Sequence, residues 1–192
     1  STLMRSSAAS DVYKRQHSII GKDLDSLADD VSFGVAPSLI VFSLFKEMDY
    51  SGAMESLAGV FPYLAFLLSV FSALRLAKFN NDTRQTSSFV GLPVPANALF
   101  WASLVTGAHD WLVSSNFHPV YLLLLVCLFS WLLVSEIPMF SLKFKNLSWK
   151  DNKTSFIFLL VCIPFLIFLG ICSFSAIIVW YILLSLITRK SK

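Results

Sequence analysis

Charged residues are scarce in this sequence. Only 14% of its 192 residues are Asp, Glu, Lys or Arg, whereas 56% are hydrophobic and the mean hydropathy is +0.70. Soluble domains carry about a quarter charged residues, so the composition predicts an integral membrane protein. The net charge of +3 is small, and the basic residues form no continuous stripe, which argues against a nucleic-acid partner.

Cysteine is scarce as well, and alternating strand patterns are missing. The three cysteines, Cys127, Cys162 and Cys172, lie in or beside apolar runs at spacings that match neither a zinc site nor a disulfide framework. No segment alternates polar and apolar residues as a membrane β-barrel requires. Because backbone groups in lipid must find partners within the protein, the apolar runs are expected to be helices.

Six apolar runs predict an all-α, polytopic transmembrane helix bundle with about six membrane helices. Several runs are near the ~20 residues that a helix needs to cross ~30 Å of hydrocarbon. The first run is short, so we expect its helix to begin near Lys22, with acidic first turns in the headgroup region. The runs cover residues 31–45, 57–77, 96–113, 120–134, 155–170 and 174–188.

Positive charge is concentrated in alternate loops. These loops and the C-terminus contain Arg75, Lys78, Arg84, Lys143, Lys145, Lys150, Lys153, Arg189, Lys190 and Lys192, whereas the opposite loops contain only Lys46. The positive-inside rule therefore predicts that the basic loops and the C-terminus are cytoplasmic, in the cell (inner) membrane. The same topology puts the acidic stretch 23–30 on the cytoplasmic side.

Four acids, Asp23, Asp25, Asp29 and Asp30, stand directly before the first apolar run. Gly21, Asp25 and Asp29 are spaced by four residues, so on a helix they share one face. Two carboxylates there could ligate a hard divalent cation, and the glycine would let a phosphate approach the backbone. The alternative is that acids in the first turns are solvated and favour the helix dipole.

The same three residues resemble part of a family signature. CDP-alcohol phosphatidyltransferases carry D-x2-D-G-x2-A-R-x8-G-x3-D-x3-D, and Gly21, Asp25 and Asp29 match its last three fixed positions. Four longer stretches are similar to the phosphatidylserine synthase branch of this family: GKDLDSLADDVSFGVAP, ALRLAKFN, GLPVPANA and PMFSLKFK. The resemblance predicts three parts: a polar segment over 1–16, a CDP-alcohol phosphatidyltransferase-like membrane domain over 17–145, and an additional pair of membrane helices over 146–192.

The resemblance implies an enzyme of phospholipid biosynthesis. It would transfer a phosphatidyl group from CDP-diacylglycerol to L-serine, giving phosphatidylserine and CMP. Asp25 and Asp29 would ligate divalent metal, Mg²⁺ or Mn²⁺, and Asp29 would also accept the proton of the serine hydroxyl as general base. A pair of metal ions can stabilise both the attacking and the leaving oxygen at phosphorus. Membrane lipids are the expected surroundings, and a homodimer is compatible with this reading.

The resemblance also suggests substrate-binding residues, Gly21, Arg75, Lys78 and Asn80. Arg75 and Lys78 are three apart at a helix end and could both offer charge to a phosphate or to the serine carboxylate. Basic residues at cytoplasmic helix ends are also expected in any membrane protein. Asn80 could hydrogen-bond the substrate or cap a helix end.

The N-terminal residues depart from the signature. Its first five fixed positions would fall on Met4, Ser7, Ala8, Asp11 and Val12, and none of these is the residue required. We therefore expect the matching part to begin near His17. Since half of the metal-binding acids would then be missing, the chain as written is expected to bind metal and CDP-lipid weakly and to turn over little.

Two other functions stay open. One is the same transferase class with another acceptor, such as glycerol phosphate, inositol phosphate or choline. The other is a non-catalytic membrane protein, a small transporter or scaffold, whose acids bind an ion in passing. A transport pathway usually needs charged residues in the middle of its helices, and the apolar runs have none there, which disfavours this second alternative.

Overall fold

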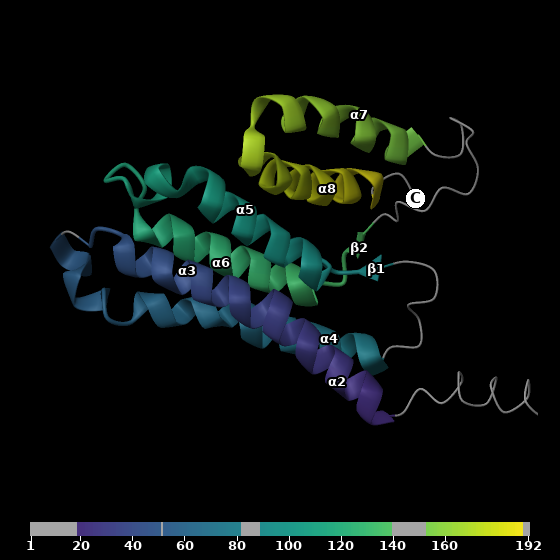
Figure 1. Ribbon diagram of the computed structural model, residues 1–192, viewed down its shortest axis with the longest axis horizontal. Helices are drawn as coiled ribbons and strands as arrows, with labels where there is room; N and C mark the ends of the chain where they lie inside the picture. The colour runs from purple at the N-terminus through teal and green to yellow at the C-terminus, as the bar shows by residue number, and fades with distance from the viewer. Residues whose placement is uncertain (1–18, 51, 82–88, 140–152, 190–192) are drawn as a thin grey trace, which may run out of the picture.

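The computed structural model describes residues 19–50, 52–81, 89–139 and 153–189 (Figure 1). The predictions for residues 1–16 and for the basic residues between 140 and 152 lie outside this part. The elements follow in the order α2 (Ile19–Asp30), η1 (Val31–Val35), α3 (Ala36–Glu47), η2 (Gly52–Leu57), η3 (Phe61–Phe66), α4 (Leu67–Asn81), β1 (Phe89–Val90), α5 (Val94–Val113), α6 (Pro119–Val134), β2 (Pro138–Met139), α7 (Lys153–Phe168), η4 (Gly170–Cys172) and α8 (Ser173–Arg189).

The first membrane helix is longer than its apolar run, as predicted. α2, η1 and α3 form one rod, and its stretch Asp23–Glu47 is long and apolar enough to span a bilayer. The middle of the rod is a π-helical turn, Val31–Val35, directly before Pro37. Proline has no N–H to donate and its ring crowds the carbonyl four residues earlier. The wider π-turn relieves that crowding without breaking the helix.

The second membrane helix begins later than its apolar run suggested. The run was expected to start at residue 57, but the spanning helix starts at Phe61 as a 3-10 helix, η3, and becomes α-helical at Leu67. Pro62 lies in the first turn of η3 instead of the helix interior. Proline suits this position because an N–H in the first turn has no carbonyl of the same helix to bond, so its absence costs nothing. The helix continues to Asn81, past the expected end at residue 77.

The other four apolar runs are helices close to their predicted bounds. Pro95 lies in the first turn of α5, and α5 is kinked near its far end, at Ala108. Pro164 lies inside α7. Within the described ranges, the stretches long and apolar enough to span a bilayer are Asp23–Glu47, Phe61–Asn80 and Gly170–Thr188, while Pro119–Val134 and Thr154–Phe168 are apolar but shorter.

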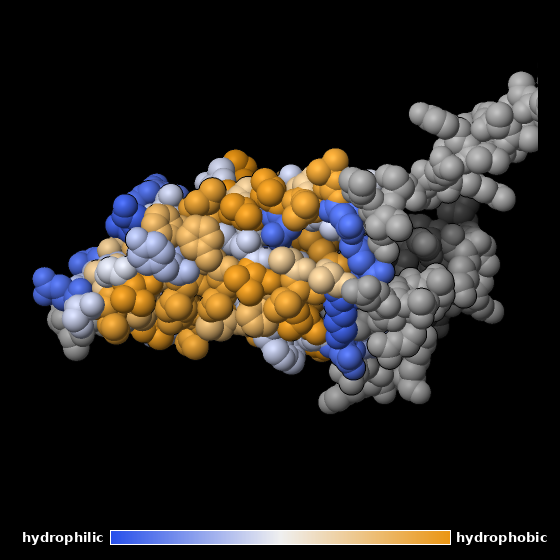
Figure 2. All heavy atoms as spheres, turned by 90° about the horizontal axis from the view of Figure 1, so that it is seen from below, coloured by the Kyte–Doolittle hydropathy of each residue, from blue (hydrophilic) through white to orange (hydrophobic). Residues whose placement is uncertain are grey.

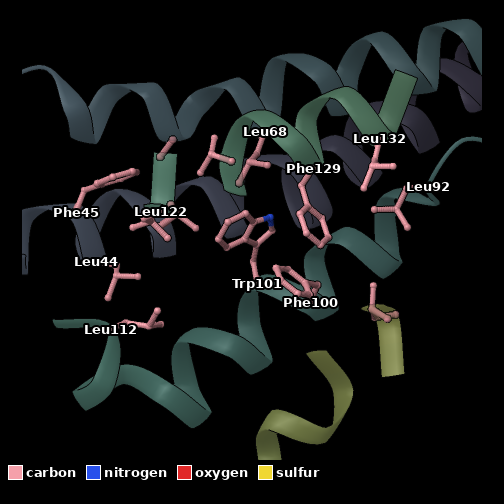
Figure 3. Close-up of a cluster of buried hydrophobic side chains, with 14 of the residues drawn as sticks. Leu44, Phe45, Leu68, Leu92, Phe100, Trp101, Leu112, Leu122, Phe129 and Leu132 are labelled. Atoms are coloured by element: carbon pink, nitrogen blue, oxygen red, sulfur yellow. The ribbon is translucent and has the colours of Figure 1, made fainter. Parts of the chain in front are cut away.

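The helices pack around a core that centres on Trp101 of α5. α3 packs against η3 and α5, α4 against α6, and α5 against α8. Figure 3 shows Trp101 beside Phe100 and Phe129, with Leu68 and Leu122 close by. The Phe100 and Phe129 rings are stacked with centroids 4.0 Å apart, and Trp101 meets Phe129 edge to face at 5.6 Å.

The outer surface is apolar between two hydrophilic ends. In Figure 2 orange residues cover the middle of the molecule, and blue residues gather towards both ends. α7 lies at the margin of the bundle and packs on α8 (Figure 1). Its outward side chains are strongly exposed, with Ile167 at 70% and Phe168 at 82%. In water such a surface would be costly, so it is best matched by the hydrocarbon of a bilayer.

A short antiparallel strand pair, which the sequence did not predict, closes one end of the bundle. β1 pairs with β2, with Phe89 opposite Met139. The next residue, Gly91, donates its N–H to Ile137 O at 2.8 Å and has a φ of 75°. A Cβ there would lie 2.8 Å from both Leu133 O and Ser135 O, so only glycine fits this turn. The turn leads into α5 and lies against Arg75 of α4.

Candidate functional site

The candidate site residues come together at one end of the bundle, called here the site end. It holds the start of α2, the end of α4, the start of α5 and the end of α8 (Figure 1). α2 packs directly against α4. The acids of α2 and the basic residues of α4 therefore lie at the same end, although about 50 residues separate them in the sequence.

Asp25 and Asp29 follow one another by one turn on α2. Asp25 is exposed and Asp29 is half-buried, and the exposed Gly21 lies one turn before them. Carboxylate oxygens are the ligands that Mg²⁺ and similar hard cations prefer. No group of three or more His, Cys, Asp or Glu side chains in the described segments is close enough to hold a metal ion. The two acids thus fit as part of a divalent-cation site, and water, a phosphate or other residues would have to complete it.

Arg75 and Lys78 contact different partners, whereas their spacing of three residues suggested that both could bind one phosphate or carboxylate. Arg75 is only 6% exposed, and its Nη1 lies 3.3 Å from the position that a Cβ of Gly91 would take. Tyr181 of α8 is near enough to interact electrostatically with the guanidinium. α8 thus reaches the site end, as the predicted topology requires, but no sequence signal indicated that Tyr181 lies beside Arg75.

Lys78 lies nearer to water. Its Nζ is 3.3 Å from Glu136 Oε1, and the two side chains are 39% and 75% exposed. Exposed ion pairs of this kind contribute little stability, because water screens them and both side chains lose freedom. An anionic ligand could therefore replace Glu136 as the partner of Lys78 at small cost.

Asn80 contacts α2. Its Nδ2 donates a hydrogen bond of 2.7 Å to Ser26 Oγ, which joins the last turn of α4 to the middle of α2. Sequence reasoning singled out Asn80 as a substrate or capping residue and missed Ser26. The available signal was that Ser26 and Asp30 are four residues apart and therefore share a helix face.

Asp30 differs from the other acids of α2. Its Oδ1 is buried and has no hydrogen-bond partner within the described ranges, and the same is true of Ser72 Oγ on α4. Both side chains border Gly34, where an added Cβ would run into Asp30 Oδ1 and would lie 2.9 Å from Ser72 Cβ. No sequence pattern separates Asp30 from its solvated neighbours, because its burial depends on which residues of α4 lie opposite it.

Comparisons with known proteins agree with the resemblance seen in the sequence. No family model matches the chain. A CDP-diacylglycerol–serine O-phosphatidyltransferase of Helicobacter pylori is 31% identical over 185 residues, which cover 90% of this chain and 73% of that protein. The Bacillus subtilis protein of the same name is 33% identical over 118 residues, 62% of this chain and 57% of that protein. An archaetidylserine synthase of Methanothermobacter thermautotrophicus is 35% identical over 91 residues, 47% of this chain and 35% of that protein.

Proposed function

This chain belongs to the family of CDP-diacylglycerol–serine O-phosphatidyltransferases, and we propose that it transfers a phosphatidyl group from CDP-diacylglycerol to L-serine, giving phosphatidylserine and CMP. The observation that carries the proposal is the similarity to the Helicobacter pylori enzyme over 90% of this chain. The chain spans 57% of the Bacillus subtilis relative, so the activity of the whole relatives is extended to it as a proposal.

In the proposed reaction the serine hydroxyl oxygen attacks the lipid-side phosphorus of CDP-diacylglycerol. A new P–O bond forms, the bond to the cytidylate oxygen breaks, and CMP leaves. Asp29 accepts the hydroxyl proton as general base. Asp25 and Asp29 would supply two ligands to Mg²⁺ or Mn²⁺, which when bound would neutralise charge on the diphosphate. Their spacing of one helical turn supports this part of the proposal.

Positive groups of α4 are proposed to bind the anionic parts of the substrates. Lys78 is the more accessible, and a phosphate or the serine carboxylate would replace Glu136 beside it. Arg75 is buried under the Gly91 turn, so the serine carboxylate would have to approach it on the side where that turn lies. Gly21, which lacks a side chain on the acidic face of α2, would let the nucleotide approach, and Asn80 would hydrogen-bond a substrate or act through Ser26.

We propose that the site end faces the cytoplasm in the cell (inner) membrane, together with the C-terminus. Among the described residues, Arg75, Lys78 and Arg189 lie on the elements that reach this end, whereas Lys46 lies at the opposite end of α3, and this bias supports that orientation. It also suits the reactants, because the lipid tails would stay among the helices while serine and the nucleotide arrive from water.

Release of CMP from CDP-diacylglycerol tests the proposal. Membranes carrying the full chain are incubated with CDP-diacylglycerol, serine and Mg²⁺ or Mn²⁺, and CMP is quantified. Asp29→Asn should lower the rate about 100-fold or more, since a positioned general base contributes at least that much. Asp23→Asn is the matched control. Asp23 is exposed on the same helix, but it precedes Asp25 by two residues and therefore points about 200° around the axis from it.

The outcomes separate the alternatives. Serine-independent CMP release that rises with glycerol phosphate, inositol phosphate or choline would indicate another acceptor within the same class. An Asp29→Asn variant as active as the wild type would contradict the proposed role of this site, and robust turnover by the wild type would contradict the low activity expected from the incomplete signature.

A further inference from the structure

We propose that the contacts of α2 and η1 with α4 position the two site carboxylates by fixing the rotation of α2 about its own axis. The inference rests on the proposed function, in which these carboxylates hold a divalent cation. The residues involved, called here the polar seam, make one hydrogen bond, from Asn80 to Ser26, and one packing contact, at Gly34 between Asp30 and Ser72. Asn80 is then a positioning residue, which acts on the site through Ser26.

The seam and the acids occupy neighbouring faces of the same helix. Ser26 follows Asp25 directly, and Asp30 follows Asp29 directly. Consecutive residues of an α-helix are rotated by about 100° around its axis. When Ser26 and Asp30 face α4, Asp25 and Asp29 must therefore point about a quarter turn away from it. Any rotation of α2 would move both acids together.

Two contact points hold this rotation. The first is the 2.7 Å hydrogen bond from Asn80 Nδ2 to Ser26 Oγ. The second is the close approach at Gly34, where an added Cβ would lie 2.9 Å from Ser72 Cβ. Ser26 and Gly34 are eight residues apart on one helix, and Asn80 and Ser72 are eight apart on the other. The contacts are thus in register between antiparallel helices.

Eight residues correspond to about 12 Å along a helix. One contact would leave α2 free to pivot around it, whereas two contacts about 12 Å apart fix rotation and sliding together. The buried end of the seam is tight, because Ser72 is 0% exposed and Asp30 Oδ1 fills the space above Gly34. The Ser26–Asn80 bond is therefore the adjustable end of the seam, and it is the one next to the acids.

Metal affinity reports the positioning directly. The full chain in nanodiscs is titrated with Mn²⁺ alone, and free Mn²⁺ is followed by electron paramagnetic resonance. Ser26→Ala and Asn80→Ala should each weaken binding about tenfold, the size seen when a residue that orients a metal ligand is lost. Ser26→Thr keeps the hydroxyl and should bind as the wild type does. Ser103→Ala is the matched control and should leave Mn²⁺ binding unchanged. It also removes a buried serine contact between two helices, the 2.5 Å contact of Ser103 with Ser175, but these helices are α5 and α8 instead of α2 and α4.

The result separates this inference from the proposed function. If Asp25→Asn and Asp29→Asn leave Mn²⁺ binding unchanged, the metal site of the proposed function is wrong. If those two variants lose binding while Ser26→Ala and Asn80→Ala keep it, only the positioning role is wrong. Loss of CDP-lipid binding in Asn80→Ala but not in Ser26→Ala, with Mn²⁺ binding intact in both, would instead make Asn80 a direct substrate ligand.

A second measurement does not depend on the metal. In a background without Cys127, Cys162 and Cys172, a nitroxide on Asp29→Cys reports whether that position faces water or lipid. Adding Asn80→Ala should change its accessibility to a water-soluble relaxation agent relative to oxygen. An unchanged accessibility would overturn the inference whether or not Mn²⁺ binds.

Discussion

Replacing Gly34 with alanine tests how closely the first membrane helix must approach α4. The added Cβ would collide with Asp30 Oδ1 and would lie 2.9 Å from Ser72 Cβ. The aspartate can swing away, but the Ser72 Cβ is attached to the backbone of α4 and moves only with the helix. Relief of the clash therefore requires α2–η1 and α4 to separate by a few tenths of an ångström.

Two opposing contributions set the size of the effect. Overpacking a tight site costs about 1–3 kcal/mol, while alanine is a better helix former than glycine by up to about 1 kcal/mol. The clash should win, with a net loss of about 1–2 kcal/mol in the free energy of unfolding. For a chain of this size each kcal/mol lowers Tm by about 2–4 °C, so Tm should fall by several degrees.

Thermal unfolding of the detergent-solubilised chain, followed by tryptophan fluorescence, measures this loss. Gly59→Ala is the control, because a Cβ there meets nothing within 4 Å and should leave Tm nearly unchanged. A Gly34→Ala protein as stable as the wild type, or more stable, would refute the close approach on which the polar seam depends.

Three further substitutions probe other parts of the bundle. Gly91→Ala forces an L residue into a φ of 75° and brings its Cβ 2.8 Å from two carbonyl oxygens, so stability should drop by about 2 kcal/mol or more in thermal unfolding; an unchanged Tm would contradict the turn geometry. Trp101→Ala empties the centre of the core and should cost about 3–5 kcal/mol in the same assay, whereas the exposed Trp111→Ala should cost little.

Much of the fold could be predicted because membrane helices carry local signals. A run of apolar residues must bury its backbone polar groups in its own hydrogen bonds, so each of the six runs became a helix. The shortness of the first run predicted that its helix starts early, near Lys22, and α2 does begin earlier than the run, at Ile19. The start of the second helix was missed, because the apolar side chains before Pro62 have the right composition but form turns and a short 3-10 helix instead.

The sequence by itself determined the membrane class of the protein and the shared face of Asp25 and Asp29, because hydropathy and a spacing of four are local properties of one helix. Only the tertiary structure decided which polar groups are buried and what they contact. Asp30 lies beside Ser72 of α4, and Arg75 lies beside the Gly91 turn and Tyr181 of α8, all of which belong to other parts of the sequence. Such contacts depend on how helices pack side by side, and no pattern within a single helix encodes that.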